Sequence, residues 1–487
     1  MRLILRQADA KIWNEASQAL AEGDADLISL WADDGCVRMA LGRREENAFD
    51  IVSLACPDGQ FPSVGAVHAP AIRLERAACD LFGLTAVGAL DRRPWLDHGR
   101  WPIAAPLGAA TPRAGESVAY PFLAAEGDGL HQIPVGPVHA GIIEPGHFRF
   151  HASGETVVRL EERLGYKHKG VDALFRGANL AAAATLAGRI SGDSTVAYAY
   201  AFALAVENAL GVKAPPRAEK LRGVMAELER IANHIGDVGA ICNDASFAIL
   251  LAHGSAWRER ALRASEAAFG HRLMMDVIVP GGLVKDIAPK GAAAIGAFTK
   301  AFRAALPRIV KLYDDTASLQ DRTVRTGLLT KALARQFAAG GYIGRASGRN
   351  FDSRRDYPYA PYDQTGCGVV AHADGDVNAR VWLRFGEIEQ SLDMIDAWLA
   401  RPPEGPTRVV LPEVAEVREG FALTEGFRGD VFAAVRLDAA GNVGRAHFRD
   451  PSWFQWPLLE AAIEGNIVAD FPLCNKSFNC SYSGVDL

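Results

Sequence analysis

Cysteine is sparse in this sequence, and no two cysteines stand in a Cys-x-x-Cys pair. The seven are Cys36, Cys56, Cys79, Cys242, Cys367, Cys474 and Cys480. An odd and scattered set is typical of reduced thiols and does not predict a disulfide framework. It also excludes any metal centre that takes four thiolates from two such pairs, the arrangement by which soft metals are commonly held.

The chain also lacks a long hydrophobic run and an excess of positive charge. Its longest weakly charged stretch, 194–206, has about 13 residues, whereas roughly 20 are needed to span a bilayer. Asp9 and Lys11 follow the start too closely for the hydrophobic region of a signal peptide. With 52 Lys and Arg against 58 Asp and Glu, the net charge of -6 does not favour a nucleic-acid partner. We therefore expect a cytoplasmic protein that binds neutral ligands or other proteins.

Several common catalytic motifs are missing as well. The sequence has no Gly-x-Gly-x-x-Gly after a strand, no Walker loop, no His-Glu-x-x-His and no Gly-x-Ser-x-Gly. This chain by itself is therefore not expected to be a nucleotide-binding or hydrolytic enzyme.

What is present predicts an α+β protein of more than one domain. The 487 residues are 49% hydrophobic and 23% charged, as in folded soluble proteins, and exceed the usual size of one core. The predicted elements are strands at 37–41 and 49–54, a helix between Pro70 and Gly83, two strands within 148–160, helices that include 216–235 and 385–399, and a hairpin at 431–448. We expect a small N-terminal α+β domain (1–101), a linker rich in Ala, Gly and Pro (102–134), and a mainly α-helical bundle domain with peripheral β-hairpins (135–487).

Histidines concentrate in the segment 136–151. His139, His147 and His151 invite a metal-site interpretation, with Glu144 as a fourth ligand. Their spacing of 8 and 4 matches no standard zinc pattern. Loop histidines that cap or turn the chain are the simpler interpretation.

The order of short motifs along the chain resembles a known family. The motifs are Gly136-Pro-Val-His139, Glu144-Pro-Gly-His-Phe-Arg149, Glu162-Arg-Leu-Gly-Tyr-Lys-His-Lys-Gly170, Val206-Glu-Asn-Ala-Leu-Gly211, Pro215-Pro-Arg-Ala-Glu-Lys-Leu-Arg222, Asn233-His-Ile235, Pro280-Gly-Gly-Leu283, Ala346-Ser-Gly348, Tyr357-Pro-Tyr359 and Val485-Asp486. They resemble the large subunit of energy-converting nickel–iron hydrogenases of the formate-hydrogenlyase and hydrogenase-4 type, and equally the homologous 49-kDa quinone-site subunit of complex I.

A second resemblance covers the N-terminal region. Phe61-Pro-Ser63, His68, Leu74-Glu-Arg76 and Cys79-Asp-Leu-Phe-Gly83 resemble the 30-kDa α+β subunit that complex I places beside its quinone-site subunit. Formate-hydrogenlyase-type large subunits carry the two units fused in this order. We expect Leu74, Ala78, Leu81 and Phe82 to form the inner face of the N-terminal helix, with Glu75 and Arg76 on the opposite face as partner contacts.

The sequence departs from the hydrogenase pattern at the metal ligands. The resemblance implies four cysteine ligands, and the aligned positions are Ser191, Ser194, Ser481 and Gly484. A hydroxyl is hard and stays protonated, so it does not replace a thiolate. Cys474 and Cys480 add at most two thiolates, so we expect no metal bound by this chain. The sequence also stops at Leu487, where hydrogenase precursors carry a further segment that is cleaved after nickel insertion, which we interpret in the same way.

The resemblance to complex I implies a quinone headgroup held between a histidine and a tyrosine. The histidine matches His147, and the aspartate behind it matches Asp244. We expect these two to face one another across a cavity, because a carboxylate raises imidazole basicity and fixes its tautomer. The tyrosine position falls on Gly192, and Tyr198 or Tyr200 would have to replace it.

These observations predict a nickel-free large subunit of a complex-I-related membrane oxidoreductase. His147 and Asp244 are the candidate catalytic residues, and Ser191, Ser194, Ser481 and Gly484 the candidate cavity lining. The expected acceptor is a quinone first and an unknown small molecule second, and NAD binding is implied only for the family as a whole. Expected partners are an iron–sulfur small subunit, which carries the cluster, and antiporter-like membrane subunits, with the chain peripheral on the inner face of the cell membrane. The alternatives are a non-catalytic structural or coupling subunit and, third, an active hydrogenase.

Overall fold

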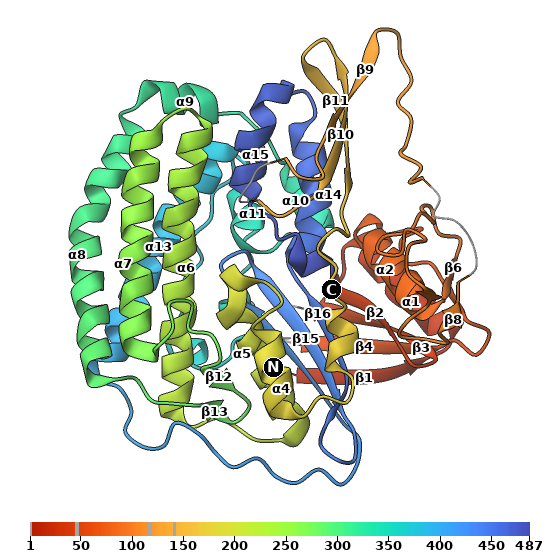
Figure 1. The fold of residues 1–487 in the computed structure, drawn as a ribbon, viewed down its shortest axis with the longest axis horizontal. Coiled ribbons are helices and arrows are strands. Elements are labelled where there is room, and N and C mark those ends of the chain that lie inside the picture. The colour runs from red at the N-terminus through yellow and green to blue at the C-terminus, as the bar shows by residue number, and fades with distance from the viewer. Residues whose placement is uncertain (1, 44–47, 114–118, 140–142) are drawn as a thin grey trace.

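The N-terminal region forms a four-stranded sheet with two helices on one face (Figure 1). The computed structural model describes residues 2–43, 48–113, 119–139 and 143–487. In sheet order the strands are β1 (Arg2–Ala8), β4 (Ala48–Ala55), β3 (Cys36–Arg43) and β2 (Asp26–Asp33), and the helices are α1 (Ala10–Glu22) and α2 (Ile72–Phe82). β1 runs parallel to β4, and the other neighbouring pairs are antiparallel. A short parallel pair, β5 (Gln60–Pro62) and β6 (Thr85–Val87), lies beside them.

The predicted N-terminal elements are confirmed, but one predicted surface is wrong. Leu74, Ala78, Leu81 and Phe82 are buried, and Gly83 ends α2 in the left-handed conformation with a φ of 70°. Glu75 and Arg76, however, are buried too. Glu75 accepts hydrogen bonds from Ser63 and two backbone amides, and Arg76 pairs with Asp91. Helical spacing places these charges opposite the apolar face, but the segments 63–65 and 91–94 cover that side as well.

The second face of the N-terminal sheet packs on a C-terminal sheet. That sheet contains β14 (Arg418–Glu425), β15 (Asp430–Leu437) and β16 (Val443–Arg449), in this order, and so confirms the predicted hairpin. Trp31 stacks on His447 with ring centroids 5.2 Å apart, and Ser29 Oγ lies 2.8 Å from His447 Nε2. The two sheets therefore share one hydrophobic layer, which joins the first hundred residues to the rest of the chain.

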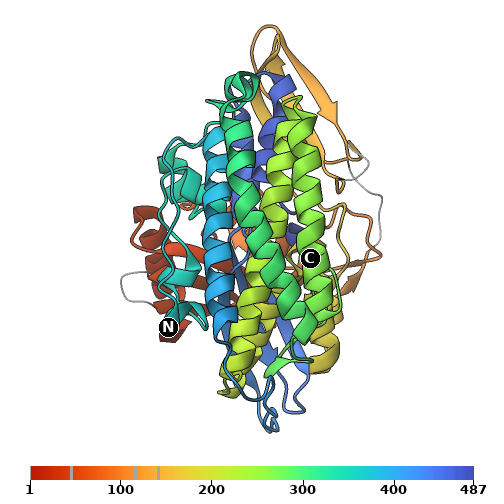
Figure 2. The same cartoon turned by 90° about the vertical axis from the view of Figure 1, so that its left-hand side faces the viewer.

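Long helices form a bundle on the other side of the C-terminal sheet (Figures 1 and 2). The bundle contains α6 (Pro216–Asp244), α7 (Ala248–Phe269), α8 (Pro289–Asp314) and α13 (Val377–Ala400), and α5 (Thr195–Leu210) packs between it and the sheet. The apolar stripe of α6 is buried from Leu221 to Ile235, as its spacing predicts. No helix in the described part of the chain is long and apolar enough to cross a membrane.

A third sheet and two late helices complete the architecture. The sheet contains β9 (Leu130–Val135), β10 (His147–Ser153) and β11 (Thr156–Arg163), and the helices are α14 (Ser452–Ile463) and α15 (Phe471–Phe478). The shorter elements are β7 (Ile103–Ala104), β8 (Thr111–Pro112), α3 (Val171–Phe175), α4 (Leu180–Ala187), η3 (Gly192–Ser194), β12 (Ile278–Val279), β13 (Gly282–Leu283), α9 (Ala317–Thr323), α10 (Lys331–Gln336), α11 (Gly341–Ala346), α12 (Ser353–Asp356) and the 3-10 turns η2 (Ala69–Ala71), η4 (Tyr362–Gln364), η5 (Val468–Asp470) and η6 (Ser483–Val485). Parts of the predicted linker (114–118) and of the histidine-rich segment (140–142) lie outside the described residues.

Candidate functional site

Two segments far apart in the sequence bring the predicted ligand positions together. Ser191 precedes η3, Ser481 follows α15, and their hydroxyl oxygens lie 3.2 Å apart in the protein interior. Because Ser191 donates its only hydroxyl hydrogen to Asp193 over 2.8 Å, Ser481 must donate to Ser191. The backbone amide of Gly484 in turn donates to Ser481 over 2.9 Å. We call Ser191, Ser194, Ser481 and Gly484 the serine cluster.

A guanidinium group lies within the serine cluster. Arg428, in the turn between β14 and β15, contacts both carboxylate oxygens of Asp193 at 2.8 and 2.5 Å. The same side chain donates to Ser194 Oγ over 3.1 Å. Burial alone would raise the pKa of Asp193, but the guanidinium reverses this and holds the pKa below its usual value. The centre of the cluster is therefore a fixed ion pair surrounded by hydroxyls.

The fourth position of the cluster is glycine because a carboxylate fills the adjacent space. A Cβ on Gly484 would lie 2.7 Å from Asp450 Cγ, closer than packed atoms come. Asp450 is held from both sides, by the Ser452 amide at 2.8 Å and by the Tyr198 hydroxyl at 2.5 Å. Burial and the neighbouring carboxylate raise the pKa of Tyr198, so its phenol stays protonated and donates to Asp450.

The two candidate tyrosines on α5 point in different directions. Tyr198 reaches Asp450 beside the cluster, whereas Tyr200 donates to the Ala360 carbonyl and packs edge-on against Tyr359 with centroids 5.5 Å apart. Of the two, Tyr198 is the one placed at the serine cluster. Sequence reasoning missed Arg428 and Asp450, because no local pattern links them to positions that are distant along the chain.

The structure does not bring His147 and Asp244 into contact. His147, at the start of β10, lies 3.4 Å from Arg149 Nε and packs against Phe122. Burial and Arg149 lower the pKa of His147. Asp244 ends α6, where burial raises its pKa and the charge of Lys476 opposes the shift. Neither a hydrogen bond nor an ion pair joins the two described side chains, so the pairing stays a prediction.

The remaining histidines and thiols do not converge on a metal site. His151 lies 3.0 Å from Gln132, and His139 lies 3.4 Å from the Tyr482 hydroxyl. Burial raises the pKa of Cys474 to about 11 and that of Cys480 well above its usual value, so both are protonated thiols. Within the ranges that the structure describes, no three His, Cys, Asp or Glu side chains are close enough to hold a metal ion.

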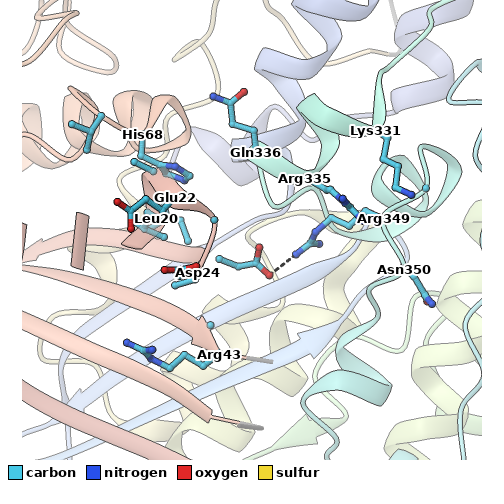
Figure 3. A pocket seen from close by; sticks show the side chains of 18 residues that line it. Leu20, Glu22, Asp24, Arg43, His68, Lys331, Arg335, Gln336, Arg349 and Asn350 are labelled. Carbon is cyan, nitrogen blue, oxygen red and sulfur yellow. Dashed lines mark hydrogen bonds and ion pairs between the residues drawn. The ribbon is translucent and has the colours of Figure 1, made fainter. Parts of the chain in front are cut away.

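A large cavity lies apart from the serine cluster. It has a volume of about 940 Å³ and opens between the N-terminal region and α10 (Figure 3). Its lining includes Glu22, Asp24, His68, Lys331 and Arg335, and no residue of the serine cluster.

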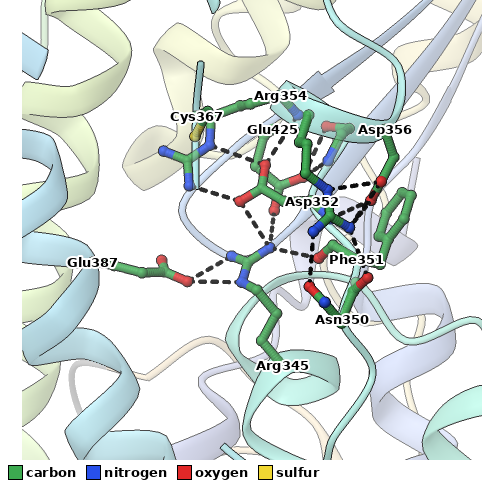
Figure 4. Close-up of polar contacts among 12 residues, drawn as sticks. Arg345, Asn350, Phe351, Asp352, Arg354, Asp356, Cys367, Glu387 and Glu425 are labelled. Atoms are coloured by element: carbon green, nitrogen blue, oxygen red, sulfur yellow. Dashed lines mark hydrogen bonds and ion pairs between the residues drawn. The ribbon is translucent and has the colours of Figure 1, made fainter. Parts of the chain in front are cut away.

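A network of buried charges joins the bundle to β14 (Figure 4). This bundle network consists of Glu227, Arg230, His234, Arg345, Asp352, Arg354, Glu387 and Glu425. Arg345 contacts Glu387 at 2.6 Å and Glu425 at 2.8 Å, with side chains no more than 1% exposed. Four carboxylates face three guanidinium groups, and burial raises the pKa of Glu425 to about 7.

Comparison with known proteins identifies the family. Residues 246–420 match the family described as "Respiratory-chain NADH dehydrogenase, 49 Kd subunit". The membrane-bound hydrogenase subunit alpha of Pyrococcus furiosus is 30% identical over 372 residues, which cover 73% of this chain and 87% of that protein. Formate hydrogenlyase subunit 5 of Escherichia coli is 29% identical over 439 residues, which cover 88% of this chain and 77% of that protein.

A solved structure shows the same fold. A chain of the membrane-bound sulfane sulfur reductase, an archaeal respiratory membrane complex, superposes with a TM-score of 0.70 at 24% identity. The match covers 74% of this chain and 99% of that chain. The predicted α+β architecture and the predicted family are both confirmed. This chain belongs to the family of large subunits of complex-I-related membrane hydrogenases and oxidoreductases, together with the 49-kDa-type subunits of NADH–quinone oxidoreductases.

Proposed function

We propose that this chain is a nickel-free large subunit of a complex-I-related membrane oxidoreductase, and that its serine cluster lines an acceptor site. The observation that carries the proposal is the Arg428–Asp193 ion pair inside the cluster. A cationic side chain is fixed beside the positions where the hydrogenase pattern requires soft anionic ligands for metal cations.

Three features of the cluster oppose a nickel–iron centre. Ser191, Ser194 and Ser481 offer protonated hydroxyls, which are poor ligands for soft metals. The Asp193 carboxylate is already paired with Arg428 through both oxygens, so it is not free to ligate a metal cation. Asp450 occupies the space of any side chain at position 484. The residues present do not fit the metal group, so no step of the proposed reaction uses it.

The same residues are suited to holding and moving protons. Hydroxyl donors lead from Ser481 through Ser191 to Asp193, and Tyr198 presents a protonated phenol held by Asp450. An acceptor such as a quinone takes up two protons for every two electrons it receives, so hydrogen-bond donors beside it are required. In this proposal the electrons come from the cluster of an iron–sulfur partner subunit. The chain lies peripherally on the inner face of the membrane, with antiporter-like subunits embedded beneath it.

The test is metal analysis of the purified complex, followed by acceptor reduction. We expect no nickel, and one nickel per chain would overturn the proposal. With a reduced dye as donor and a short-chain quinone as acceptor, Ser481→Ala should lower the rate at least about tenfold, as loss of a proton-delivery group typically does. Arg428→Met should lower the rate by a similar factor, because Asp193 loses the guanidinium that fixes it. Ser265→Ala is the matched control, because Ser265 is a buried serine on α7 that donates to the Ala261 carbonyl.

A second candidate function, a structural or coupling subunit, is favoured by one observation. Ser191 and Ser481 are only 5% and 3% exposed, which restricts access to the cluster. If both variants assembled normally and kept full acceptor-dependent electron transfer, this second function would replace the first.

A further inference from the structure

The cavity between the N-terminal region and α10 has two walls of opposite charge (Figure 3). Lys331 and Arg335 lie one turn apart on α10, are exposed, and form no ion pair within the described part of the chain. Glu22 and Asp24 face them from the end of α1 and the turn that follows. Arg43 lies on the same side but is paired with Asp50. A salt bridge between Arg349 and Asp26, 2.9 Å long, connects the walls.

The acidic wall also contains a buried histidine with an unused hydrogen-bonding group. His68 is 5% exposed, and among the residues that the structure describes its Nε2 has no hydrogen-bond partner. Burial lowers the pKa of His68 to about 4, so the ring is neutral at physiological pH. Buried polar atoms normally have partners, so an unpartnered one calls for an explanation such as a bound water, ion or ligand. A polar group held in the cavity would provide that partner.

We propose that this cavity binds a phosphorylated small molecule of nucleotide size. Two adjacent basic side chains on an exposed helix face suit a phosphate group, which accepts several charge-assisted hydrogen bonds. The carboxylates of Glu22 and Asp24 suit hydroxyl or amino donors at the other end of the ligand. The volume of about 940 Å³ lies within the range of about 300 to 1,000 Å³ that small-molecule sites occupy.

The binding site is independent of the proposed acceptor chemistry. It shares no residue with the serine cluster, and it is built from the contact between the N-terminal region and the C-terminal part of the chain. A ligand bound to both walls would stabilise that contact by an amount that grows with the logarithm of the ligand concentration above its Kd.

The test is isothermal titration calorimetry of the full chain with AMP, adenosine and inorganic phosphate at low ionic strength. We expect AMP to bind at least about tenfold more tightly than either fragment, because only AMP carries both a phosphate for the basic wall and hydroxyl and amino donors for the acidic wall. Lys331→Gln combined with Arg335→Gln should weaken AMP binding about tenfold or more, and Asp24→Asn should weaken it without affecting the affinity for phosphate. Lys300→Gln, an exposed lysine on α8, is the control and should change nothing.

Three results would overturn the proposal. They are no AMP binding, AMP binding that survives the double substitution, and phosphate binding as tight as that of AMP. The substituted side chains are exposed, so circular dichroism should show unchanged folding, and Asp24→Asn tests the acidic wall separately.

Discussion

The serine cluster and the bundle network both consist of buried charges, yet they differ in access to solvent. In the bundle network every ion-pair side chain is at most 1% exposed. Its carboxylates and guanidinium groups come from α6, α11, α12 and its N-cap, α13 and β14, and each charge contacts at least one of opposite sign. In the serine cluster the Asp193 side chain is 34% exposed, although its partner Arg428 is only 5% exposed. Solvent therefore reaches the Asp193 carboxylate of the cluster but none of the ion pairs of the network.

The largest effect is expected from breaking the bundle network. Glu387→Gln removes the charge that faces Arg345 and His234. The buried guanidinium of Arg345 then keeps Glu425 and Asp352 but loses its shortest ion pair. We expect the free energy of unfolding to fall by about 3 to 5 kcal/mol. Urea unfolding followed by tryptophan fluorescence measures it. Asp315→Asn, which removes an exposed ion pair with Lys311, is the control and should leave stability unchanged. Equal effects of the two variants would refute the structural role of the network.

A smaller loss is expected from the corresponding change in the cluster. Arg428→Met leaves Asp193 without its charged partner, and we expect the free energy of unfolding to fall by about 2 kcal/mol at pH 7. This effect is smaller than in the network because Asp193 is partly solvated. The pKa of Asp193 is lower in the folded protein than in the unfolded chain, so the ionised carboxylate stabilises the folded state at pH values above the pKa of the unfolded chain. This stabilisation is lost as the pH falls through the pKa of the folded protein. The difference between variant and natural protein should therefore shrink in acid. A constant difference from pH 7 to pH 3 would contradict this explanation.

A third change tests the carboxylate at the N-terminus of α5. Glu229 accepts from the amides of Val196 and Ala197, and burial raises its pKa to about 8. The protonated Glu229 therefore contributes its full stability to the folded state at pH values below the pKa of the unfolded chain, and this contribution is lost as the pH rises toward 8. In the natural protein the free energy of unfolding should fall by up to about 1.4 kcal/mol per pH unit between pH 5 and pH 8, and Glu229→Gln should abolish this fall. Parallel stability curves for the two proteins would show that Glu229 does not titrate in this range.

The smallest effects are expected from removing one serine hydroxyl in each region. These two substitutions compare the regions directly. Ser191→Ala removes a hydroxyl between Ser481 and Asp193, and we expect the free energy of unfolding to fall by about 1 kcal/mol. Ser391→Ala removes a 2.5 Å hydrogen bond to the fully buried Glu227, and we expect about 2 kcal/mol, because a charged group loses its donor without gaining water. Equal costs would mean that solvent access does not distinguish the regions.

Local patterns in the sequence predict the elements but not the contacts between them. The apolar stripe of α6 and the hairpin β15–β16 follow from residue spacing alone, because both are set by neighbours within a few positions. The burial of Glu75 and Arg76 could not be predicted, because it depends on loops that return to cover the second face of α2. A helical pattern identifies one buried face and gives no information on what covers the other.

The site shows the same limit. The meeting of Ser191 and Ser481 could be expected only from the resemblance to a family, since no spacing in this chain connects them. Arg428 and Asp450 were missed because charged residues in the segments that follow a strand are ordinary surface positions until the fold places them inside. Asp193 stood within the serine motif and could have been noticed as an acidic residue between two hydroxyls.

The contact between Gly484 and Asp450 bears on how such a site can change over evolutionary time. A cysteine at position 484 and the present Asp450 carboxylate require the same volume, so a lineage can have one or the other but not both. Because Tyr198 and the Ser452 amide hold that carboxylate in place, a single substitution of Gly484 by cysteine would produce a clash before it produced a ligand. A change between the proposed site and a metal-binding one would therefore require position 450 to change as well.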